Sequence, residues 1–369
     1  MKLGSAQLRT GYTQVIGRCE HCVFRKSCGG KWAFGGEMWN CFDLHPYRAG
    51  DDDVCPANPE FAAMLAEVNG LMFEWLDVIH QRRTGLPLYV PHLSHQYGRL
   101  YPLPWPVVAL TPYQLFRRPN GRYQMVVEGA AELREFFRLA PETRIVLRGT
   151  DLDRPLETYW AHRRIDEAAE QIALIGVDLM VAPNFSHFGD ATRTDHLYNR
   201  KRQLICAGEL NRAGVNVAPH LSAAVDADWE FWGCYLAERP EISVVAKEFQ
   251  TGNRAALPSL HCLERIATIQ NRLGRPLHPI LIGGAHLIEA AAMRFETFTV
   301  LDSRPFQNAL HRYVFEPKGR RPRWMSSQQL PGLGVDGLML TNLQRYERWL
   351  AVRATSAVGV RFLHARRTA

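Results

Sequence analysis

The chain is predicted to fold as an α/β protein, a (β/α)8 TIM-like barrel with an N-terminal cysteine-rich metal-binding module. Eight short apolar runs recur between residues 87 and 303, and helical stretches follow most of them. Short β-branched runs that alternate with amphipathic helices are typical of βα units on a parallel sheet, and eight units suggest a closed barrel. Five of the eight cysteines lie in the first 55 residues, which indicates the separate module.

The eight runs are four to six residues long and cover residues 88–93, 107–111, 144–148, 177–182, 215–218, 242–246, 279–282 and 298–301. A barrel of this type carries its chemistry on the loops that follow the strands. Those positions are unusually polar here: they hold His92, His95, Thr111, Asp151, Asp153, residues 184–190, His220, Lys247, Glu248, His286, Asp302 and Arg304. We therefore expect the functional site at this end of the barrel.

Composition places the chain among ordinary globular proteins, with 46% hydrophobic and 22% charged residues in a length of 369. The formal charge of +7 favours anionic partners, although it is also compatible with simple solubility. No apolar run is long enough to span a membrane, and the first residues lack the apolar core of a signal peptide. We expect a cytoplasmic protein without a membrane partner, and both a homodimer and a multi-protein complex stay open.

The N-terminal cysteines are spaced as metal ligands. Cys19, Cys22, Cys28 and Cys41 are the expected ligands of one centre, and Cys55 is the spare candidate. Zinc would accept four thiolates, and so would a [4Fe–4S] cluster. The Cys-x2-Cys-x5-Cys-Gly-Gly spacing resembles the auxiliary-cluster motif of radical enzymes, which favours iron–sulfur. Metal binding would then replace apolar burial in holding this segment together.

The chain is predicted to have four parts. Residues 1–57 form the module and 58–86 a linking region, with a helix over 58–83 that Asn58 caps. Residues 87–315 form the barrel, including a helix near 307–313. Residues 316–369 hold a basic loop and a last helix over 342–352.

Two resemblances attach to particular stretches. Residues 149–160, 181–186, 198–200 and 214–219 resemble an uncharacterised barrel-like family known mainly from phages and mobile elements. Its Pro-Asp-Phe-Ser signature has Asn184 in place of the Asp here. Residues 242–315 are similar to the last βα units of tRNA-guanine transglycosylases and of their DNA-acting deazaguanine relatives. That family's Asp-Ser-Gly-Gly-Phe-Gln motif is absent, with residues 111–116 in its place, and so is its C-terminal zinc motif.

The second resemblance implies base exchange on DNA or RNA, in which a carboxylate attacks the sugar C1′ and expels the base. Asp302 is the carboxylate nearest to the family's nucleophile, and Asp151 or Asp190 would be the second acid or base. The expected contacts to the base come from Asn184, Gln250, the backbone of Gly283 and Gly284, His286 and Arg304. A salt bridge from Asp302 to Arg304 or Arg312 is the structural alternative.

Two other function classes stay open. The strand-end histidines His92, His95, His220 and His286, with Lys247 and Asp302, would suit a metal-dependent barrel hydrolase. A non-catalytic nucleic-acid-binding subunit of a defence or mobile-element system is the third class.

Basic and aromatic positions predict a nucleic-acid partner. Cations would neutralise phosphates and an indole would stack on a base. The expected residues are Arg200, Lys201, Lys318, Arg320, Arg321 and Trp324. A solvated helix face explains Arg200 and Lys201 equally well.

Overall fold

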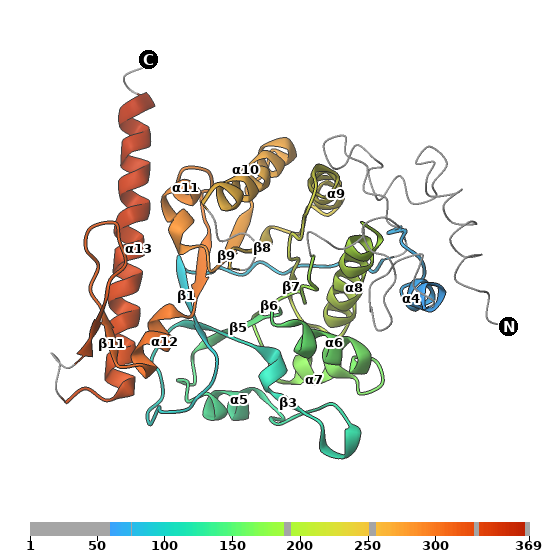
Figure 1. Cartoon of the computed structure of the whole chain (residues 1–369), viewed down its shortest axis with the longest axis horizontal. Coiled ribbons are helices and arrows are strands. Elements are labelled where there is room, and N and C mark those ends of the chain that lie inside the picture. The colour runs from blue at the N-terminus through green and yellow to red at the C-terminus, as the bar shows by residue number, and fades with distance from the viewer. Residues whose placement is uncertain (1–59, 75, 188–192, 251–255, 328–331, 366–369) are drawn as a thin grey trace.

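The computed structural model describes residues 60–74, 76–187, 193–250, 256–327 and 332–365. Eight strands form one parallel sheet in the order β7-β6-β5-β2-β1-β10-β9-β8, and helices surround them in Figure 1. The strands are β1 (Tyr89–Leu93), β2 (Val107–Leu110), β5 (Arg144–Arg148), β6 (Leu179–Val181), β7 (Val217–Ala218), β8 (Val244–Glu248), β9 (His278–Ile282) and β10 (Thr299–Asp302). Each run predicted from the sequence overlaps one of these strands, so the eight-stranded parallel sheet is confirmed.

The sheet is nearly closed into a barrel, and its seam lies between β7 and β8. Just beyond β7, His220 forms a parallel bridge with Ala246, whose amide donates to the carbonyl of Pro219 at 2.9 Å. At the other end of the seam, Gln81 donates hydrogen bonds to the carbonyls of Val217 (3.0 Å) and Val244 (2.8 Å). The side chain of a residue upstream of the first strand therefore joins the two edges.

Apolar side chains fill both sides of the sheet. The interior of the barrel is an apolar cluster of buried residues, here called the inner cluster: Val90, Val107, Ala109, Val146, Leu179, Val181, Ala218, Val244, Ala246, Ile280, Ile282 and Leu301. A second and larger core packs the outer face of the sheet against the helices. Two buried faces explain why the strands are continuously apolar rather than alternating.

Ten α-helices lie in the described part of the chain: α4 (Phe61–Glu67), α5 (Ala130–Phe136), α6 (Asp153–His162), α7 (Ala168–Leu174), α8 (Arg193–Arg212), α9 (Asp226–Ala237), α10 (Ala256–Leu273), α11 (Ile288–Ala292), α12 (Arg304–Leu310) and α13 (Val335–Ala365). Two small hairpins are added, β3 (Phe116–Arg117) with β4 (Gln124–Met125), and β11 (Tyr313–Phe315) with β12 (Trp324–Ser326). None of the described helices combines the length and apolar character needed to cross a bilayer.

The first βα unit lacks its helix. Residues 94–106 connect β1 to β2 without an α-helix, and α13 packs beside β1 instead. The rings of Tyr346 on α13 and Tyr89 on β1 meet with centroids 5.3 Å apart. The last helix of the chain thus occupies the layer that the first unit leaves open, at the left of Figure 1.

Two helices differ from their predicted ranges. The helix expected over 58–83 spans only Phe61–Glu67 in the described residues, because Asn69 (φ 56°) and Gly70 (φ 71°) take the left-handed conformation that ends helices. The Gly70 N–H bonds to the carbonyl of Leu65, and no further α-helix follows among the described residues before β1. The last helix is much longer than the predicted 342–352, since it spans Val335–Ala365.

Candidate functional site

The strand register directs polar side chains into one end of the barrel. Residues paired across a parallel sheet point to the same face, and successive residues of a strand point to opposite faces. Three polar residues at strand ends pair with members of the inner cluster: His92 with Ala109, Arg148 with Val181, and Glu248 with Ile282. His220 pairs with Ala246, which belongs to the same cluster. We call this end, lined by His92, Arg148, His220 and Glu248, the mouth.

A cation and two carboxylates interact at the mouth. Burial lowers the pKa of Arg148, while the charges of Asp151 and Glu248 act in the opposite direction. Burial raises the pKa of Glu248, and the nearby Asp151 raises it further, although Arg148 and Lys247 oppose the shift. Glu248 can therefore hold a proton at a higher pH than an ordinary glutamate, as a general acid requires.

The imidazoles at the mouth are neutral. Burial holds the pKa of His92 and of His220 well below the usual value, and the charges of Arg148 and Lys247, respectively, add to the effect. His92 Nε2 lies 2.9 Å from the Thr111 hydroxyl. His220 Nε2 accepts the backbone N–H of Glu248 at 3.0 Å. The neutral ring of His220 must then carry its proton on Nδ1.

Several buried polar atoms near the mouth have no hydrogen-bond partner. They follow three neighbouring strands and are Arg148 Nε, Thr150 Oγ1, Asn184 Oδ1, His187 Nε2 and His220 Nδ1. Burial without a partner costs about 1–3 kcal/mol for each group. Such a cost at one place is expected where a polar ligand supplies the missing donors and acceptors. The set contains both: Arg148 and His220 offer N–H groups, and Asn184 offers a carbonyl oxygen.

The surroundings of His187 leave its Nε2 as an unprotonated hydrogen-bond acceptor. Its Nδ1 donates to the carbonyl of Phe185 at 3.0 Å, which leaves Nε2 as a bare acceptor. Burial and the nearby charges of His196 and Arg200 lower its pKa to about 3. The ring is therefore neutral at physiological pH and can accept a hydrogen bond.

Close strand packing fixes Arg148 and Thr150. A Cβ atom on Gly149 would lie 2.1 Å from the carbonyl oxygen of Val181 on β6. The Gly149 carbonyl also accepts the hydroxyl of Tyr113 at 2.8 Å. Only glycine allows this approach. The close packing of Gly149 against β6 therefore fixes the positions of its neighbours Arg148 and Thr150.

Asp302, the expected nucleophile, does not face the mouth. It pairs with Pro91 and follows Leu301, an inner-cluster residue, so its side chain points outward toward α13. Arg304 donates to its carboxylate from Nε (2.8 Å) and Nη2 (2.5 Å). The hydroxyl of Tyr346 donates at 2.8 Å, and Asp302 is only 2% exposed. The predicted structural alternative, a salt bridge with Arg304, is what the structure contains.

Three other expected base contacts, the Gly283 and Gly284 amides and His286, already have hydrogen-bond partners. The Gly283 amide donates to the carbonyl of Leu301 (2.8 Å), and the Gly284 amide to that of Leu281 (3.3 Å). These amides are therefore not free to read a base. Gln250 is exposed and lies against Gly283, and His286 Nε2 lies 3.1 Å from the Ser259 hydroxyl.

Two expected phosphate contacts are buried instead. Arg200 is 0% exposed and pairs with Asp228, which also binds Arg193. The Lys201 ammonium donates to the carbonyls of Asn69 and Gly70, at the end of α4. Both side chains hold helices together, so the interpretation of this helix face as a phosphate-binding surface is wrong.

The basic loop near the C-terminus keeps its exposed cations. Lys318, Arg320 and Arg321 are exposed on the hairpin of β11 and β12. The ring of Trp324 is half-buried, since it stacks on Tyr346 and tilts against Phe315 with centroids 4.8 Å apart.

Some predictions lie outside the described residues. Cys19, Cys22, Cys28, Cys41 and Cys55 do so, as does Asp190. Among the residues that are described, no three His, Cys, Asp or Glu side chains gather as a metal site would require. His95 lies against the rings of Tyr97 and Phe306.

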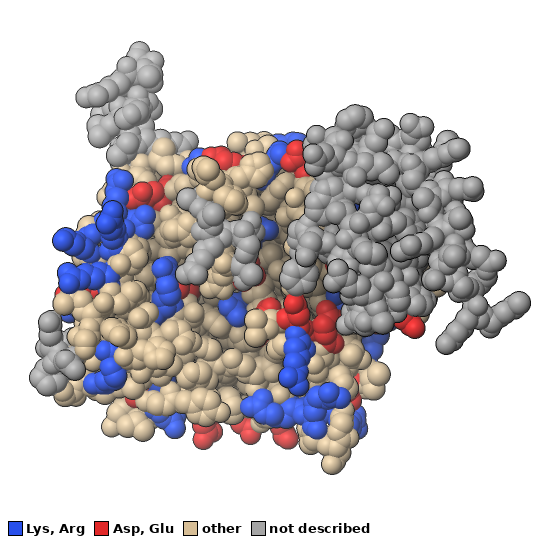
Figure 2. All heavy atoms as spheres, in the orientation of Figure 1, with Lys and Arg blue, Asp and Glu red and all other residues tan. Residues whose placement is uncertain are grey.

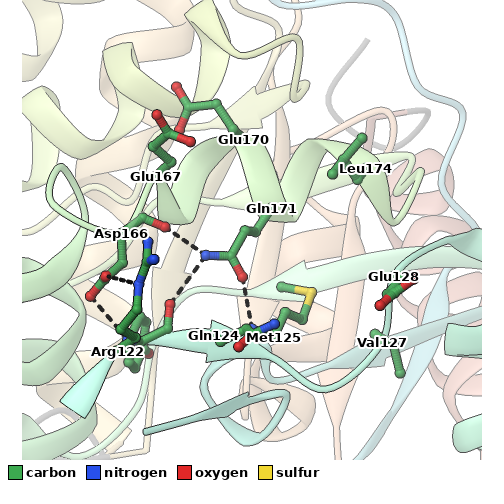
Figure 3. Close-up of a pocket in the computed structure, with 11 residues that line it drawn as sticks. Arg122, Gln124, Met125, Val127, Glu128, Asp166, Glu167, Glu170, Gln171 and Leu174 are labelled. Atoms are coloured by element: carbon green, nitrogen blue, oxygen red, sulfur yellow. Dashed lines mark hydrogen bonds and ion pairs between the residues drawn. The ribbon is translucent and has the colours of Figure 1, made fainter. Parts of the chain in front are cut away.

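A cavity lies on the outer side of the barrel, away from the mouth. It has a volume of about 550 Å³ and opens between the β3–β4 hairpin and α7 (Figure 3). Gln171 accepts the Met125 N–H (2.7 Å) and donates to the carbonyls of Tyr123 (3.1 Å) and Asp166 (2.6 Å). These bonds attach the hairpin to α7, and no lining residue comes from the mouth.

No protein-family model matches the chain, and no curated protein is significantly similar to it.

The site residues predicted from the sequence did not include Arg148 or Thr150, whereas His187 lies within the polar strand-end range 184–190. Arg148 is the last residue of the apolar run predicted over 144–148. Its signal was the alternation in residues 144–148: if Val146 faces the interior, Arg148 must do so too.

Proposed function

We propose that this protein is a transglycosylase-like enzyme that exchanges a base in DNA or RNA, with the reacting nucleoside bound at the mouth. The observation that carries the proposal is the set of buried, unpartnered polar atoms beside two carboxylates and a guanidinium. A nucleobase edge carries alternating donors and acceptors and would satisfy such a set. The reaction class comes from the resemblance of residues 242–315 to the transglycosylases.

The mouth suggests roles different from those expected for Asp302. In the proposed reaction the carboxylate of Asp151 attacks the sugar C1′ as the C1′–N bond breaks. The electron pair of that bond goes to the leaving base, and the carboxyl proton of Glu248 is transferred to it. The incoming base then loses a proton to Glu248 and displaces Asp151 from C1′, which restores both carboxyl groups to their starting states.

Charge and hydrogen bonding support these roles. The carboxylate of Asp151 accepts a hydrogen bond from the adjacent N–H of Leu152 at Oδ1. The carboxylate of Asp302, by contrast, is bound by the side chains of Arg304 and Tyr346. The raised pKa of Glu248 suits proton donation. Arg148 would orient the base or an adjacent phosphate, and Asn184 would accept a hydrogen bond from the base.

The test is incorporation of radiolabelled guanine into bulk tRNA and into single-stranded and duplex DNA. Glu248→Gln should lower incorporation by about 100-fold or more, since proton transfer contributes about 10²–10⁴ in rate. Asp151→Asn should lower it at least as much, because it removes the nucleophile. Glu170→Gln, an exposed glutamate at the outer cavity, is the matched control and should act as the wild type. Without incoming base, the wild type should form a covalent nucleic-acid adduct that Asp151→Asn lacks.

Other results would point to the remaining function classes. Metal-dependent release of product without incorporation would favour the hydrolase. Tight nucleic-acid binding without turnover by the wild type would favour the binding subunit. Full incorporation by both carboxylate variants would remove the reaction from the mouth.

A further inference from the structure

A loop beside the mouth displays large apolar side chains from a rigid base. The loop is residues 94–106, which replace the helix of the first βα unit. Within it Arg99 is 1% exposed and donates to the carbonyls of Phe137 (2.6 Å) and Arg138 (2.5 Å). Asp336, in the first turn of α13, accepts the N–H groups of Leu100 (2.7 Å) and Tyr101 (3.3 Å). The backbone here is fixed by a buried cation and a carboxylate.

The residues beside these anchors point into solvent. Tyr97 and Tyr101 are each 68% exposed, and Leu100 is 73% exposed. Fixing a loop so firmly while exposing three large side chains is typical of an interaction site rather than of a fold requirement.

A third exposed aromatic ring, that of Tyr313, lies near this loop. A Cβ atom on Gly98 would lie 3.6 Å from Leu310, which places the loop beside the end of α12. Tyr313, three residues beyond Leu310, is 42% exposed and begins β11. We call Tyr97, Leu100, Tyr101 and Tyr313 the aromatic platform. At its other end, His95 lies against Tyr97 with ring centroids 5.1 Å apart, three residues beyond His92 of the mouth.

Cations continue from the platform along the hairpin. The exposed cations near and on the hairpin are Arg312, Lys318, Arg320, Arg321 and Arg323. Trp349 Nε1 donates to the carbonyl of Gly319 (3.0 Å), which fixes the tip of the hairpin against α13. Arg320 pairs with Glu289 at 3.4 Å but remains 79% exposed. Lys and Arg predominate along the left edge of Figure 2, over the position of β11 and α13 in Figure 1.

We infer that the aromatic platform and the basic hairpin together bind a single-stranded segment of nucleic acid whose reacting nucleoside enters the mouth. Unpaired bases would stack on Tyr97 and Tyr101, whereas the bases of a duplex are already stacked on one another. The hairpin cations would neutralise the phosphates. From Tyr313 to Gly319 an extended chain spans about 20 Å. That distance suits a site within the range of about 4–16 nucleotides found for single-strand binders. The inference rests on the proposed nucleic-acid substrate.

Fluorescence anisotropy with a 12-nucleotide oligo(dT), the corresponding oligo(rU) and a 12-base-pair duplex tests this inference. Tyr97→Ala/Tyr101→Ala should weaken single-strand binding by about 30-fold or more, because each stacked base contributes about fivefold or more. Tyr97→Phe/Tyr101→Phe keeps the rings and should bind as the wild type. Arg320→Ala/Arg321→Ala should reduce the slope of log affinity against log salt by about 1.4. Leu174→Ala, a 70% exposed side chain at the outer cavity, is the control.

Three outcomes would overturn the inference. The first is wild-type affinity in the Tyr97→Ala/Tyr101→Ala protein. The second is a preference for the duplex. The third is a dimer, seen by sedimentation, that Tyr97→Ala/Tyr101→Ala dissociates while the oligonucleotide affinity stays unchanged. The platform would then be the contact with a second copy of this chain.

Binding is measured without incoming base, so the two proposals can fail separately. Normal single-strand binding with no base exchange would refute only the proposed reaction. Base exchange that persists when the platform is removed, with affinity unchanged, would refute only the inferred binding surface.

Discussion

The hydroxyl of Tyr346 donates a 2.8 Å hydrogen bond to Oδ2 of Asp302, and so joins α13 to the end of β10. Arg304 binds both the carboxylate and the Tyr346 hydroxyl. A residue near the end of the chain thus completes the environment of the carboxylate that the transglycosylase resemblance marked as a nucleophile. The cluster attaches the last helix to the barrel.

Tyr346→Phe removes the hydroxyl and keeps the ring. The free energy of unfolding should fall by about 1.5–3 kcal/mol, since the lost bond is to a charged group. Denaturant unfolding measures the change. Tyr101→Phe, at a 68% exposed ring, should have almost no effect, and equal values for the two variants would contradict the role of Tyr346.

Asp302→Asn should lower stability but leave catalysis intact. We expect a loss of about 1–3 kcal/mol, less than for a fully buried ion pair, because the Arg304 side chain is 43% exposed. Base exchange per folded molecule should stay near the wild-type rate. A drop of 100-fold or more without loss of fold would return Asp302 to the reaction.

Glu248 should make stability depend on pH. Burial raises the pKa of Glu248 in the folded protein above that of the unfolded chain. Its contribution is therefore fully present below the unfolded pKa of about 4.3 and is lost as the pH rises through the folded value. From pH 4 upward, the unfolding free energy of the wild type should fall relative to that of Glu248→Gln. Glu170→Gln should keep the wild-type dependence, and parallel curves for wild type and Glu248→Gln would count against a raised pKa.

Gly149→Ala should destabilise the protein and displace the mouth residue Arg148 and its neighbour Thr150. The added Cβ would meet backbone atoms of β6, which cannot rotate away, so the cost should reach about 3 kcal/mol or more. Gly85→Ala, at an exposed position outside any helix or strand, places its Cβ in open space and is the matched control. Thermal unfolding compares the two, and nucleic-acid binding should weaken only in the first, since Arg148 and Thr150 flank Gly149. Similar melting temperatures would refute the close approach.

Cys22→Ala and Cys28→Ala should each release metal from protein purified without oxygen. Iron with sulfide would identify a cluster, and zinc without sulfide a zinc site. Cys234→Ala, which removes an exposed free cysteine on α9, should retain the full metal content. Retention of metal by both N-terminal variants would refute the assignment.

The strands were predictable because β-branched residues and breaks leave a local record in the sequence. The direction of each strand-end side chain was predictable in principle: with Leu301 inside, Asp302 must point out. The burial of Arg200 and Lys201 was not predictable, because it depends on Asp228 and on the end of α4, which are distant in the sequence. The short α4 was missed because the apolar spacing continues past Asn69 and Gly70 while their backbone turns left-handed.

The side chain of Gln81 links the two edges of the sheet from a segment that precedes all of its strands. It bonds to both β7 and β8, and Asn216 binds the neighbouring backbone of Arg82 in both directions. A chain starting at residue 87 would contain all eight strands and yet lack the Gln81 hydrogen bonds that join the edge strands β7 and β8. Residues 76–86 therefore act as a ninth structural member of the barrel, one that contributes a single side-chain amide, that of Gln81, in place of a strand.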